Sequence, residues 1–277
     1  ELLRRGVVIH SVSMNRTGLN PLKDIRTIVS FFLLIKRLSP DFVLAYTVKP
    51  VLYGMIAAFL AGVPNRVALI TGLGYAFSGE QRLVPRMVAL LVRYFYVVAV
   101  KVAHLTVFQN QDDKDLFHKL KILGFESNAI VVNGSGVNLN YYAKKSIFPD
   151  RITFLLIARL IRDKGIQEFV DAAQLVKREW PEARFLLAGP IDSNPNGFKA
   201  KDIERWQSDG CIEYLGELKD VREALAETSV YVLPSYREGT PRTVLEAMSI
   251  GRPIITSDAP GCRETVVDGF NGFTVPV

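Results

Sequence analysis

Residues 230–248 read Val230-Tyr-Val-Leu-Pro-Ser-Tyr-Arg-Glu238-Gly-Thr-Pro-Arg-Thr-Val-Leu-Glu246-Ala-Met. The apolar run at the start predicts a buried strand, and the Gly and Pro that follow Glu238 predict a tight turn into a helix beginning near Arg242. Backbone N–H groups and the positive end of that helix would then lie beside Glu238, an arrangement that suits phosphate. Glutamates at a helix start are also common as partners of the helix dipole, so this stretch alone leaves both interpretations open.

A second strand end, upstream, favours the phosphate interpretation. Residues 152–158 form an apolar and partly β-branched run, typical of a buried parallel strand, and Arg159 and Lys164 follow it. Open α/β sheets bind ligands at the carboxyl ends of their strands. Both side chains are cationic, and the planar guanidinium of Arg159 suits phosphate oxygens. We therefore expect an anion site formed by the ends of two strands.

An ordered set of motifs resembles the C-terminal half of retaining family-4 glycosyltransferases with the GT-B fold. The motifs are Ala158-Arg159, Lys164-Gly165, Ala188-Gly189-Pro190, Pro234-Ser-Tyr-Arg-Glu-Gly-Thr-Pro241, Leu245-Glu-Ala-Met248, Gly251-Arg-Pro-Ile254 and Gly261-Cys-Arg-Glu264. The first half more loosely resembles the branch that builds capsular, O-antigen and lipid-linked oligosaccharides, through Leu19-Asn-Pro-Leu-Lys-Asp24, Ser39-Pro-Asp-Phe-Val43, Thr47-Val-Lys-Pro50 and Thr71-Gly-Leu-Gly-Tyr-Ala-Phe77. One Glu-x7-Glu pair would be a weak signal, whereas the ordered set is a strong one.

The resemblance implies a role for each of these residues in the second half. Arg159 and Lys164 would stabilise the leaving diphosphate, and Glu238 would approach the hydroxyls of the donor sugar, so these three form the expected catalytic set. Glu246 would accept hydrogen bonds from the nucleotide ribose. The other expected donor-binding residues are Gly239, Thr240, Pro241, Gly189, Leu218 and Leu245.

The first half carries weaker candidates for the acceptor side of the site. Many members of the family have a His in a Thr-x-His-Gly segment, where this chain has Leu73, but the capsule-type branch has the same Gly-Leu-Gly pattern. Thr71, Gly72 and Gly74 are therefore expected to line the site, with an ordinary glycine-rich turn as the alternative. Lys49 is a candidate for an acceptor phosphate, and a solvated lysine is the alternative.

The pattern of apolar runs predicts the fold class α/β, with two Rossmann-like parallel-sheet domains facing a cleft. A chain of 277 residues allows two ordinary domains. Strands are expected at residues 7–12, 42–45, 66–70 and 103–108, then at 152–158, 184–189, 212–215, 230–233 and 253–256, with a last strand just before the end. Helical patterns such as 22–38 and 52–60 alternate with them. The turn-rich Asn133-Gly-Ser-Gly-Val-Asn138 suits a connection between an acceptor-side domain, 1–133, and a donor-binding domain, 134–277.

Both ends of the chain suggest a truncated domain when they are compared with the family. Glu1-Leu-Leu-Arg-Arg-Gly6 is typical of the end of a helix, and the first strand and glycine-containing loop of the acceptor domain are not found. After Phe273-Thr-Val-Pro-Val277 the closing helices of the family do not follow. We therefore expect a fragment whose second domain carries most of the nucleotide contacts.

Charge divides the chain unevenly and raises the question of a membrane surface. Residues 1–150 hold 18 Lys and Arg against 9 Asp and Glu, whereas residues 151–277 hold 16 against 19. Residues 81–100 interleave Arg82, Arg86 and Arg93 with Leu, Tyr and Phe. Such a segment suits the interface of an anionic membrane, and a core helix with a solvated basic face is the alternative. Nucleic acid is disfavoured, because no recognised nucleic-acid motif appears.

Metal and disulfide chemistry have little support in the composition. Two cysteines, Cys211 and Cys262, make no disulfide framework, and neither a CxxC motif nor a Cys/His cluster suggests a metal. We expect no cofactor, because Arg159 and Lys164 can supply the charge that a metal would bring. A cytoplasmic location fits, with peripheral association on the inner face of the cell membrane as an extension of it.

The function expected from the resemblance is transfer of a sugar from a nucleotide-sugar, in the first place a UDP-sugar, to a lipid-linked or polysaccharide acceptor in surface glycan synthesis. The family implies retention by attack from the leaving-group face, with a diphosphate oxygen as base. A sugar-nucleotide epimerase of similar fold and a non-catalytic nucleotide-sugar-binding subunit are the alternatives. A non-catalytic subunit would be expected to lose Arg159, Lys164 or Glu238, and this chain keeps all three.

Overall fold

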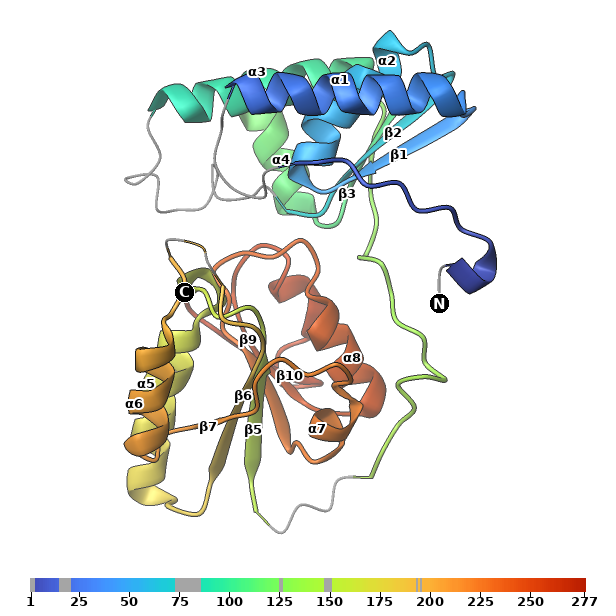
Figure 1. Cartoon of the computed structure of the whole chain (residues 1–277). Coiled ribbons are helices and arrows are strands. Elements are labelled where there is room, and N and C mark those ends of the chain that lie inside the picture. Colours follow the sequence, from blue (N-terminus) through green and yellow to red (C-terminus); the bar gives the residue numbers. More distant parts are fainter. Residues whose placement is uncertain are drawn as a thin grey trace. The chain divides into compact units, whose positions relative to one another are not determined.

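The computed structural model describes residues 3–14, 21–72, 86–124, 127–146, 151–192, 194 and 196–277. The chain divides into two units: unit 1 comprises Glu1–Phe108 and Lys114–Val131, and unit 2 comprises Gln109–Asp113 and Val132–Val277. Each unit contains its own parallel β-sheet with helices packed against it (Figure 1). The predicted pair of parallel-sheet α/β domains is therefore confirmed.

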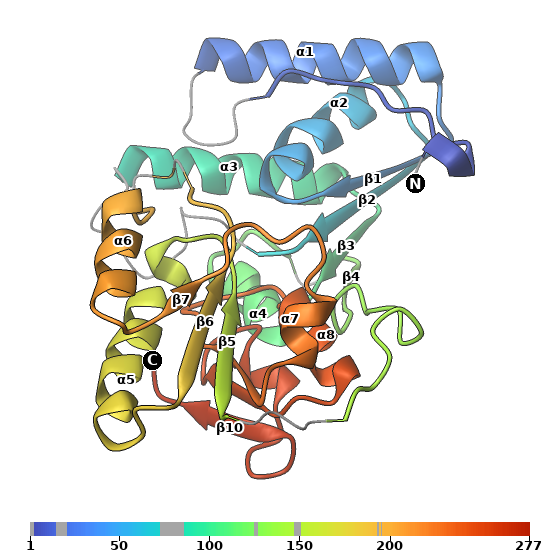
Figure 2. The ribbon, with the colours of Figure 1, turned by 60° about the horizontal axis from the view of Figure 1, so that its bottom comes forward.

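Unit 1 is built on a sheet of four parallel strands in the spatial order β1-β2-β3-β4 (Figure 2). The strands are β1 (Phe42–Tyr46), β2 (Asn65–Ile70), β3 (Leu105–Phe108) and β4 (Ala129–Val131). The helices are α1 (Pro21–Leu38), α2 (Met55–Leu60), α3 (Arg86–Val102) and α4 (Gln111–Lys119), with shorter helical turns η1 (Leu3–Arg5) and η2 (Pro50–Gly54).

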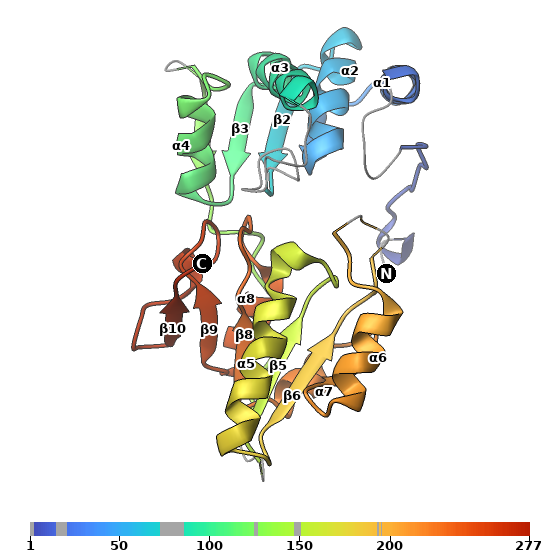
Figure 3. The ribbon, with the colours of Figure 1, turned by 90° about the vertical axis from the view of Figure 1, so that its left-hand side faces the viewer.

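The core of unit 1 forms where the helices cover the sheet. Helix α2 packs against both α1 and α3 on one side of the sheet, and α4 lies on the other (Figure 3). Fully buried rings fill the space: the ring of Phe117 packs edge-to-face against Tyr96 and Phe108, with centroids 5.0 Å apart in each pair. Such pairs contribute about 0.5–1.5 kcal/mol beyond the burial of their area.

The strand predicted at residues 7–12 is wrong. These residues form no strand, and Val7, Val8 and Ile9 are exposed. A run of β-branched residues becomes a strand only where a neighbouring backbone offers hydrogen bonds and a surface on which to pack. In the described sheet β1 is an edge strand that pairs only with β2, and residues 7–12 form no ladder with it.

Unit 2 is built on a sheet of six parallel strands. The strands are β5 (Thr153–Ile157), β6 (Arg184–Ala188), β7 (Glu213–Tyr214), β8 (Val230–Leu233), β9 (Ile254–Ser257) and β10 (Gly272–Val275). The helices are α5 (Ile166–Glu179), α6 (Ala200–Ser208), α7 (Arg222–Ala226) and α8 (Arg242–Ile250), with 3-10 turns η5 (Arg162–Lys164) and η6 (Arg263–Thr265).

The strand order in unit 2 is β10-β9-β8-β5-β6-β7, so the first strand along the chain lies in the middle of the sheet. From β5 the chain builds outward through β6 and β7, and then returns to build the other side from β8. Helices α5 and α6 cover one face and α7 and α8 the other (Figure 1). Successive residues of β5 point into the hydrophobic cores on the two faces of the sheet. Leu156 packs with α5 and α6, and Leu155 packs with α7 and α8. This is the order of a doubly wound Rossmann sheet.

The expected elements of unit 2 agree with the observed ones to within about two residues at each end. Predicted strand 230–233 coincides with β8, and the helix expected near Arg242 begins there. In unit 1, β1, β2, β3 and α1 are likewise confirmed. Strand β4 was not predicted, although Ala129-Ile-Val-Val132 is a short apolar run, and the strand itself has only three residues.

Candidate functional site

The centre of the unit 2 sheet holds the point where the strand order reverses. Strands β5 and β8 are neighbours there, and the chain leaves their carboxyl ends in opposite directions. In open α/β sheets, ligands bind in the crevice outside the strand ends at such a point. The loops that leave these two ends carry Arg159 and Lys164 after β5, and Glu238 after β8. These three sequence-predicted residues therefore share one edge of one sheet.

The two loops are joined through a glycine that no other residue could replace without strain. Gly165 has φ +70°, and a Cβ atom on it would lie 2.0 Å from the carbonyl oxygen of Pro234. The loops are also hydrogen-bonded: the Ser235 hydroxyl and the Tyr236 N–H both donate to the Asp163 carbonyl oxygen, each at 3.0 Å. The close approach of Gly165 to Pro234 thus holds Lys164 beside the loop that follows β8.

Lys164 and Glu238 form an ion pair between these loops. Lys164 Nζ lies 2.5 Å from Glu238 Oε1, and the side chains are 17% and 14% exposed. The two residues are 74 positions apart in sequence. The ion pair restricts both side chains to one orientation at the strand ends. The Lys164 ammonium is therefore already positioned to face an anion before the anion binds.

Arg159 is oriented by the carboxylate of Asp192, a residue that was not among the predicted site residues. Arg159 donates from a terminal nitrogen to Asp192 Oδ2 at 2.9 Å, and Asp192 Oδ1 accepts the N–H of Asn194 at 2.8 Å. The Arg159 side chain is 44% exposed, whereas that of Asp192 is 13% exposed. A guanidinium carries five N–H donors, so one bond to Asp192 uses only part of its capacity.

Two helices begin at the same edge of the sheet. Helix α5 follows Gly165, and helix α8 follows Pro241. Among the residues that the structure describes, no side chain caps either helix start. The first N–H groups of a helix have no partner within it, and they carry the positive end of the helix dipole. Together with Arg159 and Lys164, these helix starts make an edge suited to a diphosphate.

Glu246 lies on the second turn of α8 and is 5% exposed. Its Oε1 accepts hydrogen bonds from the Tyr142 hydroxyl at 2.8 Å and from Arg242 Nε at 2.9 Å. Burial and the neighbouring Glu246 raise the pKa of Tyr142 to about 12, so this phenol is a hydrogen-bond donor at neutral pH. The Glu246 carboxylate is therefore held in one orientation by two donors.

The turn between Glu238 and α8 is tied to residues far away in sequence. The carbonyl oxygen of Gly239 accepts from Asn110 Nδ2 at 2.8 Å, and the Thr240 hydroxyl donates to the Gln109 carbonyl oxygen at 3.0 Å. Pro241 is buried. These three residues of the expected donor-binding set thus have a fixed main chain.

The other expected donor-binding residues lie close to the same strand ends. Gly189, at the end of β6, has φ +139°, and a Cβ atom there would lie 1.8 Å from the Ala158 carbonyl oxygen. Leu218 is half-buried against the core on the α7 and α8 face, and Leu245 is half-buried on α8. The close packing of β5 against β6 therefore requires a glycine at position 189, independently of any contact with a ligand.

The acceptor-side candidates belong to unit 1. Thr71 and Gly72 directly follow β2 and are half-buried. Lys49 follows β1 and is no solvated lysine: its side chain is 12% exposed, and its Nζ lies 3.4 Å from Asp24 Oδ1. Gly74 and Leu73 fall outside the described residues.

Comparison with known proteins places these observations in a family. The family model for group 1 glycosyl transferases matches residues 151–277, and a glycosyl transferase 4-like model matches residues 1–110. The chain is 31% identical, over 282 residues, to the N,N'-diacetylbacillosaminyl-diphospho-undecaprenol alpha-1,3-N-acetylgalactosaminyltransferase of Campylobacter jejuni, covering 97% of this chain and 72% of that protein. This chain is a family-4 glycosyltransferase.

Further similarities agree with the glycosyltransferase assignment. The chain is 28% identical to the UDP-Gal:alpha-D-GlcNAc-diphosphoundecaprenol alpha-1,3-galactosyltransferase of Escherichia coli, covering 92% of this chain and 67% of that protein. Its structure is similar to sucrose-phosphate synthase from Thermosynechococcus elongatus, with TM-score 0.72, 18% identity and coverage of 94% and 67%. It is also similar to Anabaena HepE in complex with UDP and glucose, with TM-score 0.70, 21% identity and coverage of 95% and 71%. These structures show the GT-B fold for the glycosyltransferase.

Sequence reasoning missed four residues of this glycosyltransferase that hold the expected site residues in position. They are Asn110, Asp113, Tyr142 and Asp192. The polar run Gln109-Asn-Gln-Asp-Asp113 directly follows an apolar run, as Arg159 does, and that shared position is a signal that could have drawn attention to Asn110 and Asp113. No comparable sequence pattern indicates Tyr142 or Asp192 as a site residue.

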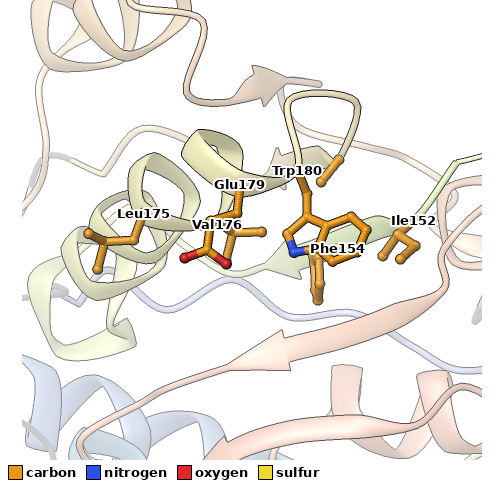
Figure 4. Close-up of a pocket in the computed structure, with 7 residues that line it drawn as sticks. Ile152, Phe154, Leu175, Val176, Glu179 and Trp180 are labelled. Atoms are coloured by element: carbon orange, nitrogen blue, oxygen red, sulfur yellow. The ribbon is translucent and has the colours of Figure 1, made fainter.

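Two other features of the glycosyltransferase bear on alternative sites. Within the described ranges, no cluster of three His, Cys, Asp or Glu side chains could hold a metal ion, and no helix has the length and hydropathy to span a bilayer. A cavity of about 340 Å³ lies at the amino end of β5, lined by Ile152, Phe154, Leu175, Val176, Glu179, Trp180 and Ala183 (Figure 4). Its lining offers one carboxylate and no cation, so it is a poor phosphate site compared with the strand ends.

Proposed function

We propose that this glycosyltransferase transfers a sugar, with retention of configuration, from a UDP-sugar to a lipid-linked or polysaccharide acceptor in bacterial surface glycan synthesis. The observation that carries the proposal is the gathering of Arg159, Lys164 and two helix starts at the switch point between β5 and β8. Relatives support the substrate class: two act on diphospho-undecaprenol-linked sugars, and the name of one specifies UDP-Gal.

The chemistry proposed for this edge is stabilisation of the leaving group. As the glycosidic bond to the nucleoside diphosphate breaks, negative charge grows on the diphosphate oxygens. Fixed cations and N–H donors aimed at those oxygens bind the transition state more strongly than the ground state, and this lowers the barrier. Arg159 and Lys164 supply the charge, so the proposal requires no metal.

Glu238 and Glu246 have separate proposed roles. Glu238 accepts hydrogen bonds from hydroxyls of the donor sugar, next to the diphosphate that Lys164 contacts. Glu246 accepts from the ribose hydroxyls, with its carboxylate aligned by Tyr142 and Arg242. Leu218 and Leu245 are proposed to pack against the nucleotide, and Gly239, Thr240 and Pro241 to bring main chain close to it.

Retention is proposed to proceed by attack from the leaving-group face. The acceptor hydroxyl approaches the anomeric carbon on the side that the diphosphate leaves, and a diphosphate oxygen takes the hydroxyl proton. Glycosidases that retain configuration instead hold two carboxyl groups about 5–5.5 Å apart, one of them as nucleophile. Glu238 has a different partner in this chain, namely Lys164, and the proposal gives it no nucleophilic role.

Loss of either cation should test the site directly. Arg159→Ala or Lys164→Ala should lower the transfer rate roughly 10²-fold or more, because each removes a donor aimed at the developing charge. The full-length protein is assayed for transfer and hydrolysis over a panel of UDP- and GDP-sugars. Arg178→Ala is the matched control, because Arg178 is exposed in the last turn of α5 and far along the helix from Gly165. Wild-type turnover in either site variant would rule out this assignment. Because the proposal requires no metal, EDTA should leave the transfer rate of the wild-type protein unchanged.

We also propose that unit 1 lies on an anionic membrane surface on the inner face of the cell membrane. Helix α3 buries Val92, Tyr96 and Ala99 in the core, as the core-helix alternative predicts. Its opposite side exposes an apolar stripe formed by Met87, Leu90, Leu91 and Tyr94, and α1 exposes a similar stripe formed by Leu22, Ile25, Val29 and Leu33. Exposed basic residues flank the α1 stripe, and the first 150 residues carry the positive excess, so an anionic interface is the matching partner. Arg82 lies outside the described residues.

Vesicle binding tests the membrane proposal. Binding to vesicles that contain anionic lipid should weaken strongly with added salt, and Leu90→Ser should weaken it further. Leu175→Ser is the control, because Leu175 is about as exposed as Leu90 but belongs to unit 2. Binding that is absent or independent of salt would contradict the proposal.

A further inference from the structure

The segment Gln109–Asp113 belongs to unit 2, although the chain on both sides of it belongs to unit 1. It leaves the end of β3 and forms the first turn of α4. Its hydrogen bonds reach residues more than 120 positions away, in the turn that follows β8.

Asn110 uses both ends of its amide group. Its Nδ2 donates to the carbonyl oxygens of Glu238 at 3.2 Å and Gly239 at 2.8 Å, while its Oδ1 accepts the N–H of Asp113 at 2.8 Å. The last bond has the geometry of a helix N-cap for α4. Asn110 is 2% exposed, so water competes little for these bonds. One side chain therefore links the start of α4 to the backbone of the Glu238 turn.

Asp113 holds the residue just before Glu238. Its carboxylate is fully buried, and Oδ1 accepts from Arg237 Nε at 3.1 Å and from a terminal nitrogen of the same guanidinium. Burial raises the pKa of the Asp113 carboxyl, and Arg237 and Asn110 act against that rise. The segment Gln109–Asp113 therefore holds both sequence neighbours of Glu238: Asp113 binds Arg237, and Asn110 binds Gly239.

Gly261 also lies close against this turn. A Cβ atom on Gly261 would lie 2.2 Å from the Glu238 carbonyl oxygen and 2.4 Å from that of Gly239. The Glu238 N–H also donates to the Pro260 carbonyl oxygen at 2.9 Å. The peptide groups around Glu238 are therefore held by Asn110 and by residues 260–261.

We propose that Asn110 is a positioning residue for the transfer reaction, acting through Glu238. Asn110 fixes the carbonyl groups of Glu238 and Gly239, and it thereby fixes the direction in which the Glu238 side chain leaves the turn. The same contact therefore positions the carboxylate that pairs with Lys164. Placement matters on this scale, because a shift of about 1 Å in a catalytic group can cost about 10²-fold in rate. The inference rests on the proposed role of Glu238 at the donor sugar.

A purely structural role for Asn110 is the alternative, and substitution can separate the two. Serine caps a helix start about as well as asparagine does, but it has no amide group to donate to two carbonyl oxygens. Asn110→Ser should therefore keep the cap of α4 and a native fold at the assay temperature, with a lower thermal midpoint from the two lost hydrogen bonds, while it loosens the Glu238 turn. Asn110→Asp also keeps the cap and directs a carboxylate at the two carbonyl oxygens, so it should impair the turn at least as much.

The experiment measures kcat, donor KM, UDP affinity and thermal midpoint for Asn110→Ser and Asn110→Asp, each made in the wild-type chain and in Glu238→Gln. In the wild-type chain both substitutions should lower kcat about tenfold to a hundredfold, with UDP affinity within about threefold of wild type. In the Glu238→Gln chain they should cause no further loss, because two residues that act through one group are not additive.

Three results would overturn the inference. Wild-type kcat in both Asn110 variants would show that the amide donors do not position the turn. Losses that multiply with Glu238→Gln would show that Asn110 acts independently of Glu238. A loss of kcat that only follows a lowered thermal midpoint would leave Asn110 a structural cap. If Glu238→Gln itself has wild-type activity, the proposed function of Glu238 fails as well, and this distinguishes the two failures.

Discussion

At the scale of single residues, the cations of the site do not stand in open solvent. Lys164 is paired with Glu238, and Arg159 is paired with Asp192. The carboxylates reduce the net charge of the edge, but they also hold each cation in one orientation before a substrate arrives. In a preorganised site little reorganisation is needed when charge develops on the leaving group. We infer that orientation, more than net charge, is what these pairs contribute.

Cys262 permits a simple check on the packing around this edge. Its thiol is fully buried behind the β8 loop, and burial raises its pKa to about 11. The thiol is therefore protonated in the native protein at pH 8, and it is shielded from reagents. Labelling with a thiol reagent at pH 8 should be slow for both cysteines and complete after denaturation, since Cys211 is also buried. One rapidly reacting thiol in the native protein would contradict this packing.

At the scale of secondary-structure elements, the site depends on how η5 meets the end of β8. The left-handed Gly165 ends η5 and begins α5, and its missing side chain allows the Pro234 carbonyl oxygen to approach. An ordinary residue there would have to move η5, and Lys164 would move with it. The glycine of the Lys164-Gly165 motif is thus explained by backbone packing rather than by contact with a ligand.

Two glycine substitutions separate this packing from backbone strain. Gly165→Ala and Gly210→Ala both place alanine at a φ near +70°, which costs about 1–2 kcal/mol. A Cβ on Gly210 meets nothing within 4 Å among the described residues, whereas one on Gly165 overlaps Pro234. Urea unfolding should therefore show a larger loss of stability for Gly165→Ala, and only this variant should lose transferase activity. Equal effects of the two substitutions on stability and activity would show that the contact with Pro234 is unimportant.

At the scale of the whole molecule, each unit has its own hydrophobic core. The clusters around Tyr96 and Ile35 lie in unit 1, and those around Phe169 and Tyr231 lie in unit 2. The proposed nucleotide contacts all come from unit 2. A ligand that binds only the folded form stabilises that form in proportion to the logarithm of its concentration. We expect UDP to stabilise unit 2 specifically.

Hydrogen exchange measured with and without UDP tests this expectation. UDP at 100 times its Kd should add about 2.7 kcal/mol of protection to the strands of unit 2. Leu52→Ala, in the core of unit 1, should cost about 2–5 kcal/mol of local stability there and leave the Kd for UDP unchanged. Weakening of UDP binding by more than about tenfold in Leu52→Ala would mean that unit 1 contributes to the nucleotide site.

The sequence by itself determined the fold class, most strands and the position of Arg159, Lys164 and Glu238 at strand ends. It could do so because apolar runs mark buried parallel strands, and parallel strands bring their carboxyl ends to one edge. The same reasoning gave a false strand at residues 7–12, because an apolar run does not reveal whether the folded sheet pairs with it.

Only the tertiary structure decided which side chains hold the site together. Asn110 meets Glu238 across 128 positions, Tyr142 meets Glu246 across 104, and Asp192 meets Arg159 across 33. None of these contacts follows from local periodicity, since each depends on how separate strands and loops are ordered in the folded sheet. The strand order of unit 2, with β5 between β6 and β8, brings such distant segments together, and chain order alone does not specify it.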